Sequence, residues 1–159
     1  MPLDSDLFRS VLGRFATGVT VITTRDAGGR DFGMTVSAFS SLSLDPPLVM
    51  FCVDRSASML DALGESAWIA VNILSASQEA LSRRFSNLEA ESRFDGIGFS
   101  RGRSGAPILD EVLAHMECEV VRRLDGGDHV IFVGKVHNAE TRDERPLLYY
   151  RGGYAQLER

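Results

Sequence analysis

The chain is poor in the residues that build metal centres, disulfides and nucleophilic active sites. Its 159 residues include only two cysteines and three histidines. No Cys-x-x-Cys or His-x-x-x-His spacing occurs, so we predict no metal site. The cysteines, Cys52 and Cys118, lie in apolar stretches, where buried free thiols are expected rather than a disulfide. No catalytic triad or pair of catalytic carboxylates stands out either.

Long apolar runs and a dominant charge are also missing. No run of eighteen apolar residues occurs, which excludes an apolar transmembrane helix. The first residues, 1–6, are acidic and lack the basic and apolar regions of a secretion signal, so we expect a cytoplasmic protein. The net charge is −5 with both signs well mixed, which argues against nucleic acid or an anionic membrane as the main partner.

What remains is the composition of an ordinary globular protein. Hydrophobic residues make up 44% of the chain and charged residues 25%. The length is enough to bury a core without disulfides or metals. We therefore expect a single domain that covers residues 1–159.

The pattern of apolar residues predicts mostly strands. A short amphipathic helix is expected over 6–15, and further helices over 57–63 and 78–85 with Ser56 and Ser77 as their N-caps. Residues 48–53 form a nearly continuous apolar run, typical of a strand covered on both faces. Residues 88–107 are read as a long surface excursion and Trp68 as a core residue. The other strands are expected over 19–24, from 31 onward, and over 68–74, 116–124, 129–136 and 147–151.

These strands favour a mainly β fold, a closed or nearly closed antiparallel β-barrel with a few short helices. Hairpin signals such as the glycines at 28–29 and 126–127 separate several of them. A doubly wound α/β sheet is the alternative. It is weaker because helices are missing between most strands and no Gly-x-Gly-x-x-Gly follows a strand.

The segment 33–48 is the most informative about function. Its sequence GMTVSAFSSLSLDPPL sets small hydroxyl residues between two strand-like stretches and ends in a double proline. Such a segment offers many hydrogen-bond donors to a flat, phosphorylated ligand with polar edges. The alternative is an ordinary polar loop, which is what most such clusters are.

Four segments in order resemble one family. They are FATGVTVIT (15–23), the segment 33–48, GAPIL (105–109) with AHMEC (114–118), and GDHVIFVGKV (127–136) followed by RPLLYYRGGY (145–154). Together they are similar to the flavin reductase domain of two-component monooxygenase systems. The resemblance implies a split β-barrel that binds FMN or FAD and works as a homodimer, with the flavin site near the subunit interface.

The resemblance also assigns roles to residues. It sets Met34, Thr35, Val36, Ser37 and Ala38 along the flavin edge, Ser40 and Ser41 toward the ribityl chain and phosphate, and Val53, Asp54, Arg55, Ser56 and Ala57 on the other wall. Phe85, with Arg83 and Arg84, would lie near the phosphate or adenine end. An amphipathic helix explains these last three equally well.

Four residues of the candidate site can be argued individually: Arg55, Ser56, His129 and Tyr154. Arg55 and the helix expected after Ser56 suit an anion. A solvated surface charge is an equally good reading of Arg55, and a helix-capping role of Ser56 is compatible with phosphate contact. His129 follows a Gly-Gly turn at the start of a strand and is the candidate catalytic residue, because the resemblance implies contact with flavin or nicotinamide. The alternative is a hydrogen-bonded structural histidine, and Asp128 would orient the turn or the ring. Tyr154 would close over the nicotinamide side or simply pack on the barrel.

The function that this pattern predicts is an NAD(P)H:flavin oxidoreductase that supplies reduced flavin to a separate monooxygenase. Since the cofactors carry the hydride chemistry, the protein needs no nucleophile or strong base. The alternative is a flavin-binding electron carrier or sensor with tightly held FMN; a pyridoxamine-phosphate-oxidase-like barrel is a third reading. The sequence leaves open FMN or FAD, and NADH or NADPH.

Overall fold

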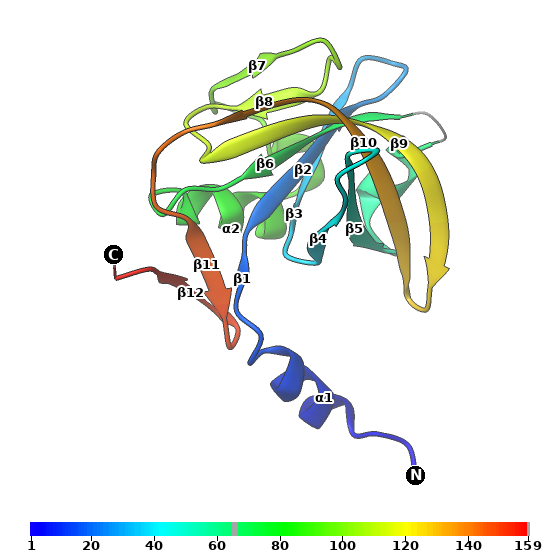
Figure 1. Ribbon diagram of the computed structural model, residues 1–159, viewed down its shortest axis with the longest axis vertical. Helices are drawn as coiled ribbons and strands as arrows, with labels where there is room; N and C mark the ends of the chain where they lie inside the picture. The colour runs from blue at the N-terminus through cyan, green and yellow to red at the C-terminus, as the bar shows by residue number, and fades with distance from the viewer. Residues whose placement is uncertain (65–66, 159) are drawn as a thin grey trace.

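Strands form most of the computed structural model, which describes residues 1–64 and 67–158 (Figure 1). The helical elements are α1 (Ser5–Leu12), η1 (Ser58–Ala62), α2 (Glu79–Asn87) and η2 (Ala90–Ser92), where η marks a 3-10 helix. The strands are β1 (Thr17–Gly18), β2 (Thr20–Arg25), β3 (Asp31–Val36), β4 (Phe39–Ser43), β5 (Leu48–Asp54), β6 (Trp68–Ile73), β7 (Phe99–Arg101), β8 (Pro107–Leu109), β9 (Ala114–Gly126), β10 (His129–Thr141), β11 (Leu147–Tyr150) and β12 (Gly153–Gln156).

The main sheet has seven strands in the order β3-β2-β6-β9-β10-β5-β4. Every neighbouring pair in it is antiparallel. A three-stranded sheet, β1-β11-β12, and a two-stranded sheet, β7-β8, accompany it. The expectation of a mainly β protein is confirmed, and the doubly wound alternative fails because it requires parallel strands.

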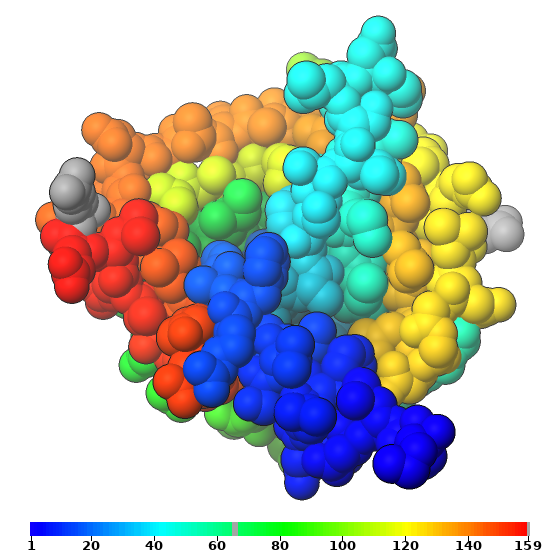
Figure 2. Space-filling model, turned by 60° about the horizontal axis from the view of Figure 1, so that its bottom comes forward, coloured from blue at the N-terminus to red at the C-terminus, as the bar shows by residue number. Residues whose placement is uncertain are grey.

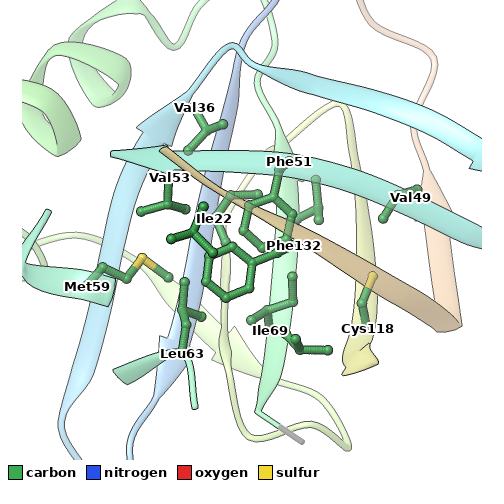
Figure 3. Close-up of a cluster of buried hydrophobic side chains, with 13 residues drawn as sticks. Ile22, Val36, Val49, Phe51, Val53, Met59, Leu63, Ile69, Cys118 and Phe132 are labelled. Carbon is green, nitrogen blue, oxygen red and sulfur yellow. The ribbon is translucent and has the colours of Figure 1, made fainter. Parts of the chain in front are cut away.

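The main sheet wraps around one apolar core. Strands from opposite ends of its order contribute to the same cluster, as Val36 of β3 and Phe51 of β5 show. Phe51 and Phe132 stack with ring centroids 5.3 Å apart near its centre (Figure 3). Burial of such large side chains is the main favourable term in folding. A flat sheet could not bring its two ends to one cluster, so the sheet must curl.

The curled sheet is not closed by hydrogen bonds. Strands β3 and β4 are its two edges, and no pairing between them occurs in the part of the chain that the structure describes. Only residues 37–38 separate them in the sequence. The predicted barrel is therefore open at this seam, where the outer backbone groups of an edge strand are available to other partners.

Several local predictions need correction. Strand β5 alternates buried and half-buried residues, so only one of its faces is fully covered. The segment at 57–63 is the short 3-10 helix η1 with Ala57 at its N-cap, and α2 begins after Gln78, so neither Ser56 nor Ser77 is the capping residue. Trp68 is 37% exposed and not a core residue.

The long excursion at 88–107 is partly ordered structure. It contains η2, and β7 pairs with β8 in an antiparallel ladder. The Arg84 side chain donates to the backbone carbonyls of Ser92, Arg93 and Asp95, which fastens the segment to α2. Strand β12 was not predicted; its short polar and glycine-containing sequence carries no clear alternation.

Helix α1 stands apart from the rest of the fold (Figures 1 and 2). Asp4 caps it by accepting a hydrogen bond from the Leu7 N–H, and Gly13 follows its last turn. The helix is strongly amphipathic, as the spacing predicted, yet none of its residues is buried. No helix in the described residues is both long and apolar enough to cross a membrane.

A buried carboxylate fixes the loop before β8. The Glu117 Oε1 accepts hydrogen bonds from the Ser104 backbone N–H at 2.9 Å and from its hydroxyl, and Oε2 accepts one from Asn138. Burial raises the pKa of Glu117, but these hydrogen bonds outweigh it and hold the pKa below its ordinary value. The loop passes so close that Gly102 leaves no room for a side chain beside Glu117.

We expect Glu117→Gln to lower the free energy of unfolding at neutral pH by about 2 kcal/mol, because hydrogen bonds to a buried charge are lost. The contribution of a carboxylate with a lowered pKa is complete above the pKa of the unfolded chain and disappears as the pH falls through the folded pKa. Urea unfolding of both proteins across the acid range should therefore show their difference shrinking as the pH falls. A difference independent of pH would contradict this account.

Candidate functional site

The edge strand β3 lies directly against helix α2. Gly33 allows this approach, because a Cβ at this position would lie 2.7 Å from the Phe85 ring and 3.1 Å from Phe94. Phe85 is fully buried, and its ring meets that of Phe94 edge to face at 5.1 Å between centroids. The absence of a side chain at Gly33 therefore sets the distance between strand and helix.

Polar contacts tie the same strand to its neighbours. The Thr35 hydroxyl donates to the Ser82 carbonyl at 2.7 Å, and the Ser82 hydroxyl lies 2.7 Å from the Tyr154 hydroxyl. Arg93 donates from Nη1 to the Gly33 carbonyl at 2.8 Å. These contacts join β3, α2, β12 and the segment after η2 around the outer side of β3.

Two adjoining cavities lie along this side of β3. The inner cavity, about 220 Å³, is lined by Met34, Thr35, Ala57, Ser58, Met59, Phe85, Ser86 and Arg93. The tyrosine cavity, about 180 Å³, is lined by Val19, Thr35, Ser37, Ser82, Ser86, Tyr149 and Tyr154. Because they share Thr35 and Ser86, the two form one groove rich in hydroxyl groups.

The groove collects part of the predicted site. Six of the predicted residues line it: Met34, Thr35, Ser37, Ala57, Phe85 and Tyr154. The side chains of Val36 and Val53 instead belong to the core, which leaves only their backbones for a ligand. Ala38, Ser40 and Ser41 are exposed on the link and on strand β4 and line neither cavity.

A second group of predicted residues gathers where β5 and β10 meet. His129 opposes Asp54 in the ladder, and its Nδ1 lies 2.7 Å from an Asp128 carboxylate oxygen. Asp54 Oδ1 accepts from the Ser56 N–H and hydroxyl, and these bonds, helped by His129, lower the pKa of Asp54. The chain runs from Asp54 in this cluster to Ala57 in the groove within three residues.

Arg55 has a partner other than a ligand. Its Nη2 lies 2.7 Å from the Asp125 carboxylate, and its Nε donates to the Gly127 carbonyl at 2.9 Å. The guanidinium thus braces the turn between β9 and β10. This arrangement favours a structural role for Arg55 over the phosphate-binding alternative.

The basic residue that does line the groove is Arg93. Residues Ser58, Ser82, Ser86 and Tyr149 also line it and were not predicted. Arg93 lies in the segment read as a surface excursion, where its position depends on contacts with α2 and β3 that no local pattern reveals. For Ser82 and Ser86, the spacing of four on a helix was a usable signal that they share a face.

Another hollow lies away from these residues. The Glu117 cavity, about 340 Å³, is lined by residues of β7 to β10, of the segment between β8 and β9, and by Arg142 just after β10; His115 and Asn138 are among them. None of the predicted site residues lines it. It is therefore the alternative ligand site with which the groove has to be compared.

Comparison with known proteins identifies the class. The family model described as "Flavin reductase like domain" matches residues 12–158. The chain belongs to this family, as the four sequence segments indicated. The resemblance is confirmed over nearly the whole chain.

Three relatives illustrate the similarity within this family. The chain is 41% identical to the flavin-dependent monooxygenase reductase subunit HsaB of Rhodococcus jostii, over 98% of this chain and 80% of that protein. A solved structure of nitrilotriacetate monooxygenase component B from Mycobacterium thermoresistibile is similar with a TM-score of 0.92 and 44% identity, over 98% and 87% of the chains. The NADH:FAD oxidoreductase SgcE6 of Streptomyces globisporus, solved with NAD and FAD fragments, has a TM-score of 0.90 and 37% identity, over 97% and 93%.

Proposed function

We propose that this protein is an NAD(P)H:flavin oxidoreductase that reduces FMN or FAD and supplies the reduced flavin to a partner monooxygenase. The observation that carries the proposal is the groove along β3, which is built by the segment that sequence analysis singled out. The family supports it, and so do the names of relatives, one a monooxygenase reductase subunit and one an NADH:FAD oxidoreductase.

The groove fits a flavin by the chemistry of its lining. Hydroxyl groups of Thr35, Ser37 and Ser86 suit polar ring edges and a ribityl chain, and the Arg93 guanidinium suits a phosphate. The half-buried Met34 provides apolar surface for a ring system. When bound, the flavin supplies the redox chemistry by accepting a hydride equivalent from the reduced nicotinamide.

The chain's own residues would then bind the flavin, orient it and shield it from water. The outer backbone groups of the edge strand and of residues 37–38 would meet the polar edge of the ring. Arg83 lies over the Tyr154 ring at 4.8 Å and Tyr149 packs against it at 5.5 Å, which fixes the wall of the tyrosine cavity. His129, held by Asp128, would act at the rim as a hydrogen-bond partner for the carboxamide or flavin carbonyl.

The alternative function is a flavoprotein with tightly held FMN that carries electrons or senses redox state. The two functions differ in whether added free flavin is reduced and released in repeated turnovers. An arrangement in which the groove lies at an open edge of the sheet supports exchange of the flavin. The pyridoxamine-phosphate-oxidase-like reading is not supported by the family match.

The test is NADH or NADPH oxidation by the purified protein, followed by absorbance, with and without added FMN or FAD. We expect turnover that saturates with added flavin. A protein that keeps its flavin through gel filtration and oxidises no NADH or NADPH when flavin is added would instead be the carrier. His129→Ala should raise the KM for the nicotinamide substrate about tenfold through the loss of one hydrogen bond, whereas Lys135→Ala, an exposed residue farther along the same strand, should leave it unchanged.

We propose further that residues 1–159 act as one cytoplasmic domain that forms a homodimer. The support is the apolar face of α1: Leu7, Phe8, Val11 and Leu12 are each about half exposed or more. Figure 1 shows α1 projecting from the sheets, and Figure 2 shows the N-terminal segment, in dark blue, on the surface. A contiguous apolar stripe on an isolated helix marks an interaction surface, and a second copy is the partner that the resemblance implies.

We expect Val11→Asp to convert the dimer to a monomer, because it sets a charge in the apolar stripe. Ser10→Asp adds the same charge on the other face of the same helix and should leave the dimer intact. Light scattering after size exclusion measures the mass of both. A wild-type monomer, or a dimer unaffected by Val11→Asp, would rule out this interface.

A further inference from the structure

A third cavity continues the groove beyond the part just described. This outer cavity, about 420 Å³, is lined by Arg30, Asp31, Phe32, Ser58, Ala90, Glu91 and Phe94. It shares Ser58 with the inner cavity. The proposed hydride transfer involves only the ring end of a flavin, so the function described so far leaves this cavity without a role.

The three cavities follow one another along β3. Ser37 lines the tyrosine cavity, and Thr35 lines both the tyrosine cavity and the inner cavity. Met34 lines the inner cavity, and Phe32 and Asp31 line the outer cavity. A strand rises about 3.3 Å per residue, so the six residues of β3 span roughly 17 Å. A site of this length suits an extended dinucleotide better than a mononucleotide.

The outer cavity has the chemistry of a purine site. The Arg30 guanidinium lies 5.4 Å from the centroid of the Phe32 ring, which makes a planar cation backed by an aromatic ring. Phe94 is held edge to face between Phe85 and Phe99, at 5.1 and 5.6 Å between centroids. Bases stack on aromatic rings and on guanidinium planes without a requirement for sequence-specific hydrogen bonds.

The carboxylates of this cavity differ in their freedom to bind a ligand. Asp31 accepts two hydrogen bonds from Arg101, at 2.8 and 2.6 Å, and is neutralised by it. Glu91 is exposed at the margin and carries an acceptor for an exocyclic amine. A second phosphate group would find a cation on either side of Ser58, Arg93 in the inner cavity and Arg30 in the outer one.

We propose that the outer cavity binds the adenylate of FAD, so that FAD is the preferred flavin of this protein. The inference rests on the proposed function. It assigns the flavin phosphate to the Ser58–Arg93 region and the adenine to the space between Arg30, Phe32 and Phe94. The adenylate of NADH has the same chemistry, and the experiment separates the two sources.

Two substitutions reach the outer cavity alone. Arg30→Ala removes the planar cation but keeps the backbone bonds of the turn, in which the Arg30 N–H donates to Asp26 and its carbonyl accepts from the Asp26 N–H. Ala90→Trp fills the cavity from η2. Arg103→Ala, an exposed arginine that lines none of the three cavities, is the matched control.

The measurement is the dissociation constant of FAD and of FMN by flavin fluorescence, with the KM for NADH. We expect wild type to bind FAD at least about tenfold more tightly than FMN, and both variants to lose about tenfold in FAD affinity, the value of one stacking contact. FMN affinity in the variants should change less than twofold, which also reports that they are folded.

Three results would overturn the inference. Equal wild-type affinity for FAD and FMN would show that the adenylate makes no contact. An equal loss of affinity for FAD and FMN would show that the cavity contacts the mononucleotide half of the flavin or that the substitutions disturb folding. A raised KM for NADH with FAD affinity unchanged would assign the cavity to the nicotinamide substrate. If neither flavin binds or is reduced by the wild-type protein, the proposed function itself fails.

Discussion

The close approach of an edge strand to a helix is the constraint on which the site depends. At Gly33 the strand β3 touches the Phe85 ring, and any side chain there would push strand and helix apart. A wider gap would lengthen the Thr35–Ser82 and Arg93–Gly33 hydrogen bonds, which stand at 2.7 and 2.8 Å. One missing side chain thus sets the width of the groove, while the curled sheet behind it supplies the rigid support.

The groove explains how a protein without a nucleophile or strong base can serve a redox reaction. Its hydroxyls, its arginine and the outer backbone groups of β3 match the polar outline of a flavin, while Met34 adds apolar surface. His129 lies beside Asp54 and Asp128, and Arg55 braces the turn that carries it. In the proposed function, the groove binds the flavin, and His129 at the start of β10 offers a polar group to the nicotinamide substrate.

The sequence predicted much of the fold and about half of the groove. Strands with β-branched residues and the hairpin at Gly29, whose φ is +82°, follow from local rules. The segment 33–48 was recognised by its hydroxyls, but local rules could not show that it forms the two edges of one sheet. Arg93 and Ser58 were not predicted, because only tertiary contacts bring them to β3. Arg55 was predicted as a site residue because of its charge, but in the structure it pairs with Asp125.

The central claim is that the ligand lies along β3 and not in the Glu117 cavity, which at about 340 Å³ is larger than the inner cavity of about 220 Å³. Hydrogen–deuterium exchange with and without saturating flavin tests it most directly, because exchange reports the loss of local opening at each segment. The account predicts slower exchange in residues 33–38, 56–59 and 82–93. Protection confined to residues 100–117 and 138–142, with β3 unchanged, would contradict it.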